Sequence, residues 1–141
     1  MRVFRLIIIL AVAGCATPAE QDGWQRVVGW SNPEMSSVQA IRFPADVVAN
    51  QAFDVTISTL GSASCTRPDG ANATVEQNVA VVTPYDFIAP PNTPCTRDLR
   101  SFTRTVSVTF PSAGPATIRL NTRTPDGTSK TFDWTIQVRP R

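Results

Sequence analysis

The residues of this chain best suited to chemistry are its three cysteines, Cys15, Cys65 and Cys95, since the sequence has no histidine. A cysteine can ligate a metal, carry an acyl group or form a disulfide. A structural zinc site needs about four ligands, commonly with C-x-x-C spacing, whereas Cys65 and Cys95 are 30 residues apart with no such motif. We therefore expect no metal site and no cofactor.

The same inventory argues against catalysis. Without histidine the commonest general base is missing, and a serine–histidine–aspartate triad is impossible. A pair of catalytic carboxylates stays open, because the sequence does not give the separations between the candidate loop residues. None of the candidate carboxylates has an aromatic, apolar sequence setting that indicates a raised pKa, and an ordinary turn position explains each of them. We expect a protein that is not an enzyme; the candidate carboxylates are Asp69, Asp86, Asp98 and Asp126.

The pattern of the first residues predicts an export signal. The apolar run at residues 6–13 is too short for a bilayer-spanning helix, which needs about 20 residues. Arg2 and Arg5 precede it and small residues follow it, as in a secretory signal peptide. The sequence VAGC at residues 12–15 resembles the lipobox of bacterial lipoproteins at all four positions. The alternative is an ordinary signal peptide that happens to contain a cysteine.

The lipobox resemblance implies cleavage before Cys15 and acylation of that residue. The chain then divides into a cleaved signal at 1–14, a lipidated cysteine and tether at 15–23, and one folded domain at 24–141. The tether residues 16–23 reach under about 30 Å even when extended. Ala16, rather than aspartate, follows the cysteine. In lipoproteins this favours the outer membrane if the host has two membranes.

Cleavage would also change the charge and the thiol count. Loss of Arg2 and Arg5 lowers the 13 basic residues to 11, equal to the 11 acidic residues. A neutral chain without a basic run has no electrostatic footprint for nucleic acid, so the expected membrane attachment is the lipid. Once Cys15 is acylated, Cys65 and Cys95 are left in an oxidising compartment, where we expect them to form a disulfide.

The folded domain shows the period-two alternation of half-buried strands and no convincing amphipathic helix. Prolines and glycines fall mostly between the alternating runs, and the tetrapeptides at 67–70 and 124–127 predict tight turns. Short strands without helices indicate a sandwich or barrel. The clear strands lie at 53–59, 105–110, 116–121 and 131–139, and less certain ones at 24–30, 38–43 and 73–83.

Residues 43–61 and 108–120 resemble parts of bacterial Ig-like domains. The first stretch, FPADVVANQAFDVTISTLG, is similar to a kinked first strand followed by strand B. The second, VTFPSAGPATIRL, is similar to strand E, a corner and strand F, and FDWTIQV would be strand G. The resemblance implies an Ig-like antiparallel β-sandwich of about seven strands. It also implies that B and E are neighbours, so that the predicted disulfide joins two loops at one end of the sandwich rather than crossing the core.

The long connection at 84–99, PYDFIAPPNTPCTRDL, is the expected site of function. Prolines and a disulfide would stiffen this loop and reduce the entropy lost on binding, and exposed aromatic residues would supply contact area. Alternatively, the apolar side chains cap the open end of the core. Arg97, Arg100 and Arg104 form either a small basic patch or solvated edge charges. The candidate binding residues are Tyr85, Phe87, Ile88, Arg97 and Arg100.

The tryptophans have separate interpretations. Trp134 lies in phase with Phe132 and Ile136 and is expected in the core. Trp24 and Trp30 either pack against the domain or lie at the membrane interface.

Three functions follow from this reading. The first is a membrane-anchored envelope lipoprotein acting as a non-catalytic binding module, with a protein or glycan partner at 84–99. The second is a passive structural or assembly accessory of the envelope. The third is a protease inhibitor that presents an end loop.

Overall fold

The computed structural model describes residues 23–35 and 39–141, and within these ranges the chain forms nine strands and no helix. The predicted signal peptide, Cys15 and the tether up to residue 22 lie outside the described residues, as does residue 38 of one predicted strand. The strands are β1 (Gln25–Val28), β2 (Ile41–Arg42), β3 (Val47–Val48), β4 (Phe53–Gly61), β5 (Thr66–Glu76), β6 (Val79–Ile88), β7 (Arg100–Val108), β8 (Gly114–Arg123) and β9 (Ser129–Arg139). The prediction of an all-β domain is confirmed.

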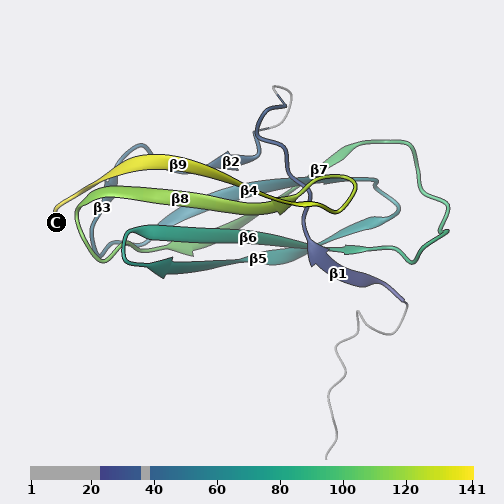
Figure 1. Cartoon of the computed structure of the whole chain (residues 1–141), viewed down its shortest axis with the longest axis horizontal. Helices are drawn as coiled ribbons and strands as arrows, with labels where there is room; N and C mark the ends of the chain where they lie inside the picture. Colours follow the sequence, from purple (N-terminus) through teal and green to yellow (C-terminus); the bar gives the residue numbers. More distant parts are fainter. Residues whose placement is uncertain (1–22, 36–38) are drawn as a thin grey trace, which may run out of the picture.

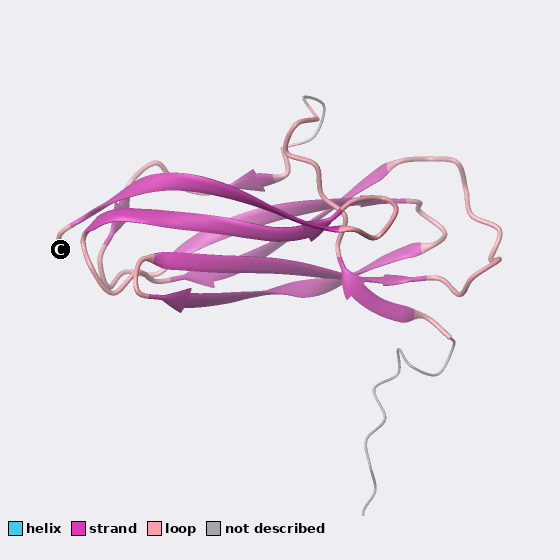
Figure 2. Cartoon of the chain, viewed as in Figure 1, coloured by secondary structure: helices cyan, strands magenta, loops and turns pink. Residues whose placement is uncertain are grey.

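The strands form two sheets that pack face to face as a sandwich (Figures 1 and 2). The larger sheet has six strands in the order β1-β6-β8-β9-β3, with β5 also paired to β6, and the smaller has the order β2-β4-β7. Strand β6 has neighbours along both of its edges. Strand β5 follows one of its edges, while β8 and β1 share the other edge, β8 beside Val79–Val82 and β1 beside Tyr85–Ile88.

The clearest alternating segments all form strands, because each buries one row of side chains and leaves the other row in water. Strands β4 and β7 are antiparallel neighbours with Gly61 opposite Arg100, as predicted for strands B and E. Strands β8 and β9 pair antiparallel, as predicted for F and G. The turn predicted at 124–127 joins β8 to β9, and Gly127 takes the positive φ of 90° that suits glycine there.

Two predictions about the middle of the chain are wrong. Residues 73–83 are not one strand but parts of β5 and β6, which reverse at Gln77 and Asn78. The tetrapeptide at 67–70 is not a turn between strands but lies inside β5, where the register shifts between Pro68 and Ala71. Gly70 has a φ of 86°, so the signal that suggested a turn instead makes a β-bulge.

The larger sheet is mixed rather than wholly antiparallel, whereas the pairs of the smaller sheet are all antiparallel. Strand β3 runs parallel to β9, and β6 runs parallel to β8. The second pairing has a simple cause: β5 and β6 form a hairpin, and it is the second strand of this hairpin that lies against β8. The sandwich has nine strands instead of about seven. Strands β6 and β8 run parallel, whereas neighbouring strands of the expected Ig-like domain would be antiparallel.

The core lies between the sheets. Phe110, Ile57, Ile118 and Leu120 are fully buried there. Trp134 packs against this cluster, as predicted, but it is only half-buried. It stands on β9, whose outer edge pairs with β3 at Val138 and Arg139 only. Burial of these apolar side chains is the main stabilising contribution to the fold.

The two ends of the sandwich differ. At one end β4, β6 and β8 finish and β5, β7 and β1 begin, and we call residues 61–66 and 89–100, together with Gly23 and Trp24, the disulfide end. The other end carries the β5–β6 turn, the segment 109–113 and the carboxyl terminus (Figure 1). We call it the far end. The described chain therefore starts at the disulfide end and finishes at the far end.

Candidate functional site at the disulfide end

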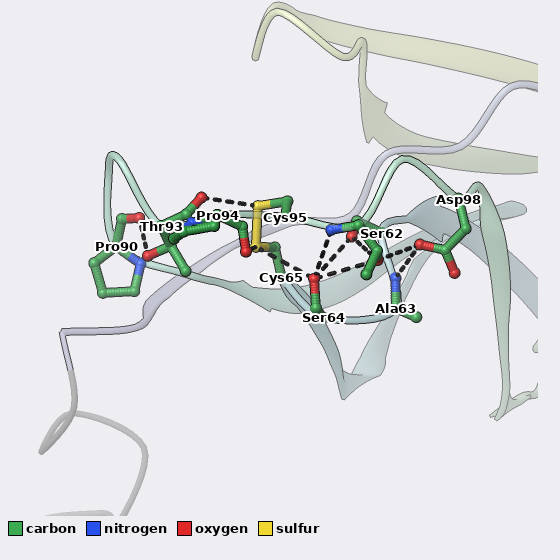
Figure 3. The surroundings of a disulfide bond; sticks show 10 residues. Ser62, Ala63, Ser64, Cys65, Pro90, Thr93, Pro94, Cys95 and Asp98 are labelled. Atoms are coloured by element: carbon green, nitrogen blue, oxygen red, sulfur yellow. Dashed lines mark hydrogen bonds between the residues drawn. A yellow bond between two sulfur atoms is a disulfide. The ribbon is translucent and has the colours of Figure 1, made fainter.

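The predicted disulfide forms between Cys65 and Cys95, with the two Cα atoms 5.6 Å apart (Figure 3). Cys65 is buried immediately before β5, and Cys95 is exposed in the segment 89–99 that joins β6 to β7. The backbone carbonyl of Cys65 also accepts a hydrogen bond from the amide of Ala89 at 3.0 Å. The bridge thus joins two connections at one end of the sandwich, as expected, and does not cross the core.

A polar network holds the second half of the segment 89–99 against the turn at 62–65. Asp98 accepts hydrogen bonds from the amide of Ala63 at 3.2 Å, from Nε of Arg100 at 2.9 Å and from the hydroxyl of Thr96. The Thr96 hydroxyl is the main cause that lowers the pKa of Asp98 from 3.8 to about 2, helped by the amide of Ala63 and by Arg100. The amide of Thr96 donates to the hydroxyl of Ser64 at 2.9 Å.

The first half of the segment is a tight turn. Thr93 donates two hydrogen bonds to the carbonyl of Pro90, from its amide at 3.2 Å and its hydroxyl at 2.6 Å. Asn92 occupies the left-handed region with a φ of 67°, which asparagine tolerates better than most residues. Pro90, Pro91 and Pro94 restrict the backbone further. The segment is therefore exposed yet held by a covalent bond, hydrogen bonds and prolines.

This rigid segment presents Leu99, which the sequence analysis did not single out. Leu99 is 51% exposed, and within the described part of the chain it is the only large apolar residue that is exposed rather than half-buried or buried. Arg97 and Arg100 flank it in sequence and are exposed, Arg100 with 68% of its side chain accessible. An exposed leucine is unremarkable alone. Its position on a stiff loop between two cations makes it a candidate contact residue.

The predicted aromatic binding residues lie elsewhere, which corrects the assignment of 84–88 to a loop. Tyr85, Phe87 and Ile88 belong to β6, and they are half-buried. The proline and the aspartate of this stretch suggested a loop, but β6 keeps its alternation through them. The free connection is therefore 89–99, and the binding loop loses its aromatic residues.

Arginines lie over the rings of Tyr85 and Trp24 on the larger sheet. The guanidinium of Arg26, on β1, lies 3.7 Å from the ring centroid of Tyr85 and pairs with Asp69 on β5. Arg67, on β5, lies 3.8 Å from the ring of Trp24. Since β6 separates β1 from β5, the two arginines cross it in opposite directions. Trp24 therefore contacts the domain, which was one of its two predicted roles.

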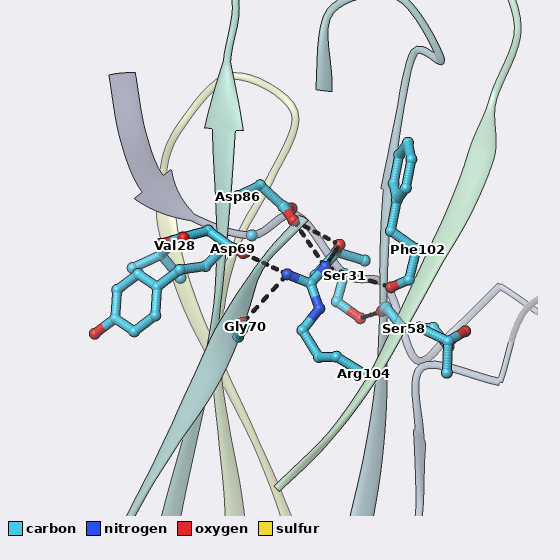
Figure 4. Close-up of polar contacts among 12 residues, drawn as sticks. Val28, Ser31, Ser58, Asp69, Gly70, Asp86, Phe102 and Arg104 are labelled. Atoms are coloured by element: carbon cyan, nitrogen blue, oxygen red, sulfur yellow. Dashed lines mark hydrogen bonds and ion pairs between the residues drawn. The ribbon is translucent and has the colours of Figure 1, made fainter. Parts of the chain in front are cut away.

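Arg104 does not belong to a basic surface patch. It is buried between the sheets, with a side chain 8% exposed, and its Nη2 lies 2.7 Å from Asp86, whose side chain is 1% exposed (Figure 4). Thr59 donates to the same carboxylate at 3.2 Å. Arg104 also donates to the carbonyls of Gly70, Tyr85 and Phe102 and to the hydroxyl of Thr59. The pair joins β7 of one sheet to β6 and β5 of the other.

The chain after β1 seals this pair from water. A Cβ on Gly29 would come within 2.4 Å of Cγ2 of Thr59 and within 2.7 Å of Oδ2 of Asp86, so only glycine fits. The chain then crosses from the larger sheet to the smaller one. Gly29 donates to the carbonyl of Pro84 at 2.9 Å, and the carbonyl of Trp30 accepts from Leu60 at 2.7 Å.

Sequence alternation carried a signal for both buried charges. Arg104 is in phase with Phe102 and Val106 on β7, and Asp86 is in phase with Ala80 and Val82 on β6. Charged residues at inward positions of two strands indicate a buried pair, because an unpaired charge there would cost several kcal/mol. The predictions of a loop position for Asp86 and a surface position for Arg104 are therefore wrong.

Metal and membrane criteria add little to this site. Within residues 23–35 and 39–141, no three histidine, cysteine, aspartate or glutamate side chains gather closely enough to hold a metal ion. In the same part of the chain, no helix is long and apolar enough to cross a membrane.

Comparisons with known proteins returned no match: no protein-family model, no curated protein and no solved structure is significantly similar to this chain.

Proposed function

We propose that this protein is a membrane-anchored envelope lipoprotein whose β-sandwich acts as a non-catalytic interaction module, with the disulfide end as its contact surface. The lipobox-like VAGC at 12–15 supports the anchor on Cys15. The observation that carries the contact surface is Leu99, which is 51% exposed on a segment fixed by a disulfide and by the Asp98 network. Rigid contact segments bind well because little conformational entropy is lost.

Anchoring is tested with the Cys15→Ser variant. We expect the wild-type precursor to be processed to an acylated form that sediments with membranes, and processing to stop on treatment with globomycin. Cys15→Ser should remain unprocessed by this route and lose the acyl groups. A wild-type chain that is soluble and unmodified by mass spectrometry would refute the anchor.

The contact surface is tested by thiol protection in isolated envelopes. A cysteine replaces Leu99 in the full-length protein, and one replaces Ser112 at the far end as the matched control, since both positions are exposed. We expect a membrane-impermeant maleimide to label position 99 more slowly in envelopes than in detergent, and position 112 at similar rates. Equal rates at position 99 would refute the contact surface and favour the passive accessory role.

A protease inhibitor is the remaining predicted function. The segment 89–99 is held by the Cys65–Cys95 bridge and by the Asp98 network, which suits an inhibitory loop. Its position beside the start of the domain does not suit that role, because a protease would have to enter the space next to the anchor. We therefore do not pursue inhibition further.

A further inference from the structure

The tether joins the domain at the disulfide end. Gly23 lies against Pro90, since a Cβ built on Gly23 would come within 3.1 Å of Cγ of Pro90. The next strand begins there as well, with Gln25 opposite Ile88. Cys15 precedes Gly23 by eight residues, which span under about 30 Å when extended. An anchor on Cys15 therefore keeps the disulfide end, and not the far end, next to the lipid.

The charge and polarity of this end suit an anionic lipid surface. Residues 61–66 and 89–100 contain two arginines and one aspartate. That aspartate, Asp98, is bonded to Ala63, Thr96 and Arg100 within the protein. Leu99 stands between Arg97 and Arg100 and supplies exposed apolar area. Arginine side chains can lay their apolar stems on a membrane while their charged groups reach the headgroups.

We infer that the disulfide end docks on the membrane itself, with Leu99 in the interfacial layer and Arg97 and Arg100 at the phosphates of anionic lipids. The inference rests on the proposed function, because the lipid on Cys15 supplies the local concentration of membrane. Two or three acyl chains on one residue hold a protein firmly at a membrane but leave its orientation free. Docking of the disulfide end fixes the orientation of the domain.

The test uses the purified, acylated full-length protein in vesicles. Leu99→Cys is labelled with an environment-sensitive nitrobenzoxadiazole dye, and Ser112→Cys at the far end is the matched control. The introduced cysteine is the single free thiol once Cys15 is acylated and Cys65 is bridged to Cys95. Because position 99 lies near the bridge, Pro91→Cys, exposed on the same segment, serves as a second variant. Intact mass confirms the disulfide in each.

With vesicles of phosphatidylethanolamine and phosphatidylglycerol, we expect the emission at position 99 to shift to the blue and its quenching by acrylamide to fall. The emission and the quenching of the label at position 112 should remain as they are in detergent. In phosphatidylcholine vesicles the shift at position 99 should be smaller. Replacing Arg97 or Arg100 with glutamine should lower the ratio of docked to undocked protein about fivefold each. Arg42→Gln, an exposed arginine on β2, should leave that ratio unchanged.

Flotation separates failure of this inference from failure of the proposed function. Protein that floats with vesicles while the labels at 91 and 99 stay as accessible as the label at 112 is anchored but not docked, which overturns the inference. Protein that does not float is not anchored, which overturns both. Protection of position 99 in envelopes but not in pure vesicles identifies a protein or glycan partner and likewise overturns docking on lipid.

Discussion

Breaking the buried pair of Arg104 and Asp86 from one side should remove much of the stability of the domain. We expect Arg104→Met to cost about 3 to 5 kcal/mol, because it leaves a carboxylate that is 1% exposed without its cation. Among the described side chains, the hydroxyl of Thr59 at 3.2 Å is then its remaining donor. The net stability of a domain is only about 5 to 15 kcal/mol, so this loss is large.

The double variant separates the charge pair from the packing. Arg104→Met with Asp86→Leu removes both charges and should be less destabilised than the sum of the single variants, by a coupling of about 2 kcal/mol. It should not regain wild-type stability, because Arg104 also bonds the carbonyls of Tyr85 and Phe102 at partly buried positions. A carbonyl left without a donor away from water costs about 1 to 3 kcal/mol.

The assay is urea unfolding of the soluble form lacking residues 1–15, at pH 7 with the disulfide intact, read by tryptophan fluorescence. The slope of unfolding free energy against urea should be the same in all variants, so that midpoint shifts report stability. The control is Arg119→Met, which breaks the exposed pair Arg119–Asp133 and should change the midpoint little. The reasoning is refuted if Arg104→Met loses no more than Arg119→Met, or if the double variant equals the sum.

Three further predictions concern the disulfide end and the chain above the buried pair. Replacing Cys65 and Cys95 together with serine should cost about 3 to 4 kcal/mol in urea unfolding and open the segment 89–99 to limited proteolysis; unchanged cleavage would mean that the hydrogen bonds suffice. Because its pKa is lowered to about 2, the ionised Asp98 stabilises the folded domain, and this contribution is complete above about pH 4 and lost as pH falls through 2. Carboxyl ¹³C titration should show this pKa, and Thr96→Val should raise it. A titration curve that is unshifted in Thr96→Val would contradict the role of the hydroxyl. Gly29→Ala should destabilise by about 1 to 3 kcal/mol through overpacking, and adding Thr59→Ser should restore part of the loss by removing the nearest methyl group, 2.4 Å from the new Cβ; a fully additive thermal shift would argue against that clash.

The sequence was most informative where one row of a strand is buried and the other is wet. Strands β7, β8 and β9 and the first half of β4 (53–57) have this character, and their periodicity follows directly from it. The disulfide was predictable from counting, because the predicted export and the predicted acylation of Cys15 leave one pairing. Both inferences depend on local patterns or on chemistry that does not require knowledge of the topology.

The errors arose where tertiary contacts override local preferences. Proline and aspartate at 84 and 86 suggested a loop, yet β6 tolerates both, because Asp86 is neutralised by Arg104 from the opposite sheet. The turn at Gln77 and Asn78 lacks glycine and proline, so β5 and β6 appeared as one strand. The parallel pairing of β6 with β8 depends on which strand of a hairpin lies inside, and alternation cannot distinguish the two.

The placement of β1 has a mechanical consequence. The described chain begins with Gly23 at the end at which β1 starts, and β1 runs from there along β6 before Trp30 joins β4. A pull on Gly23 along the strand direction would slide β1 against β6 and load its ladder of hydrogen bonds together, instead of peeling them one by one. A domain held by its first residues in this way resists traction with its whole first strand, and Gly29, which only glycine can occupy, is where that load passes from one sheet to the other.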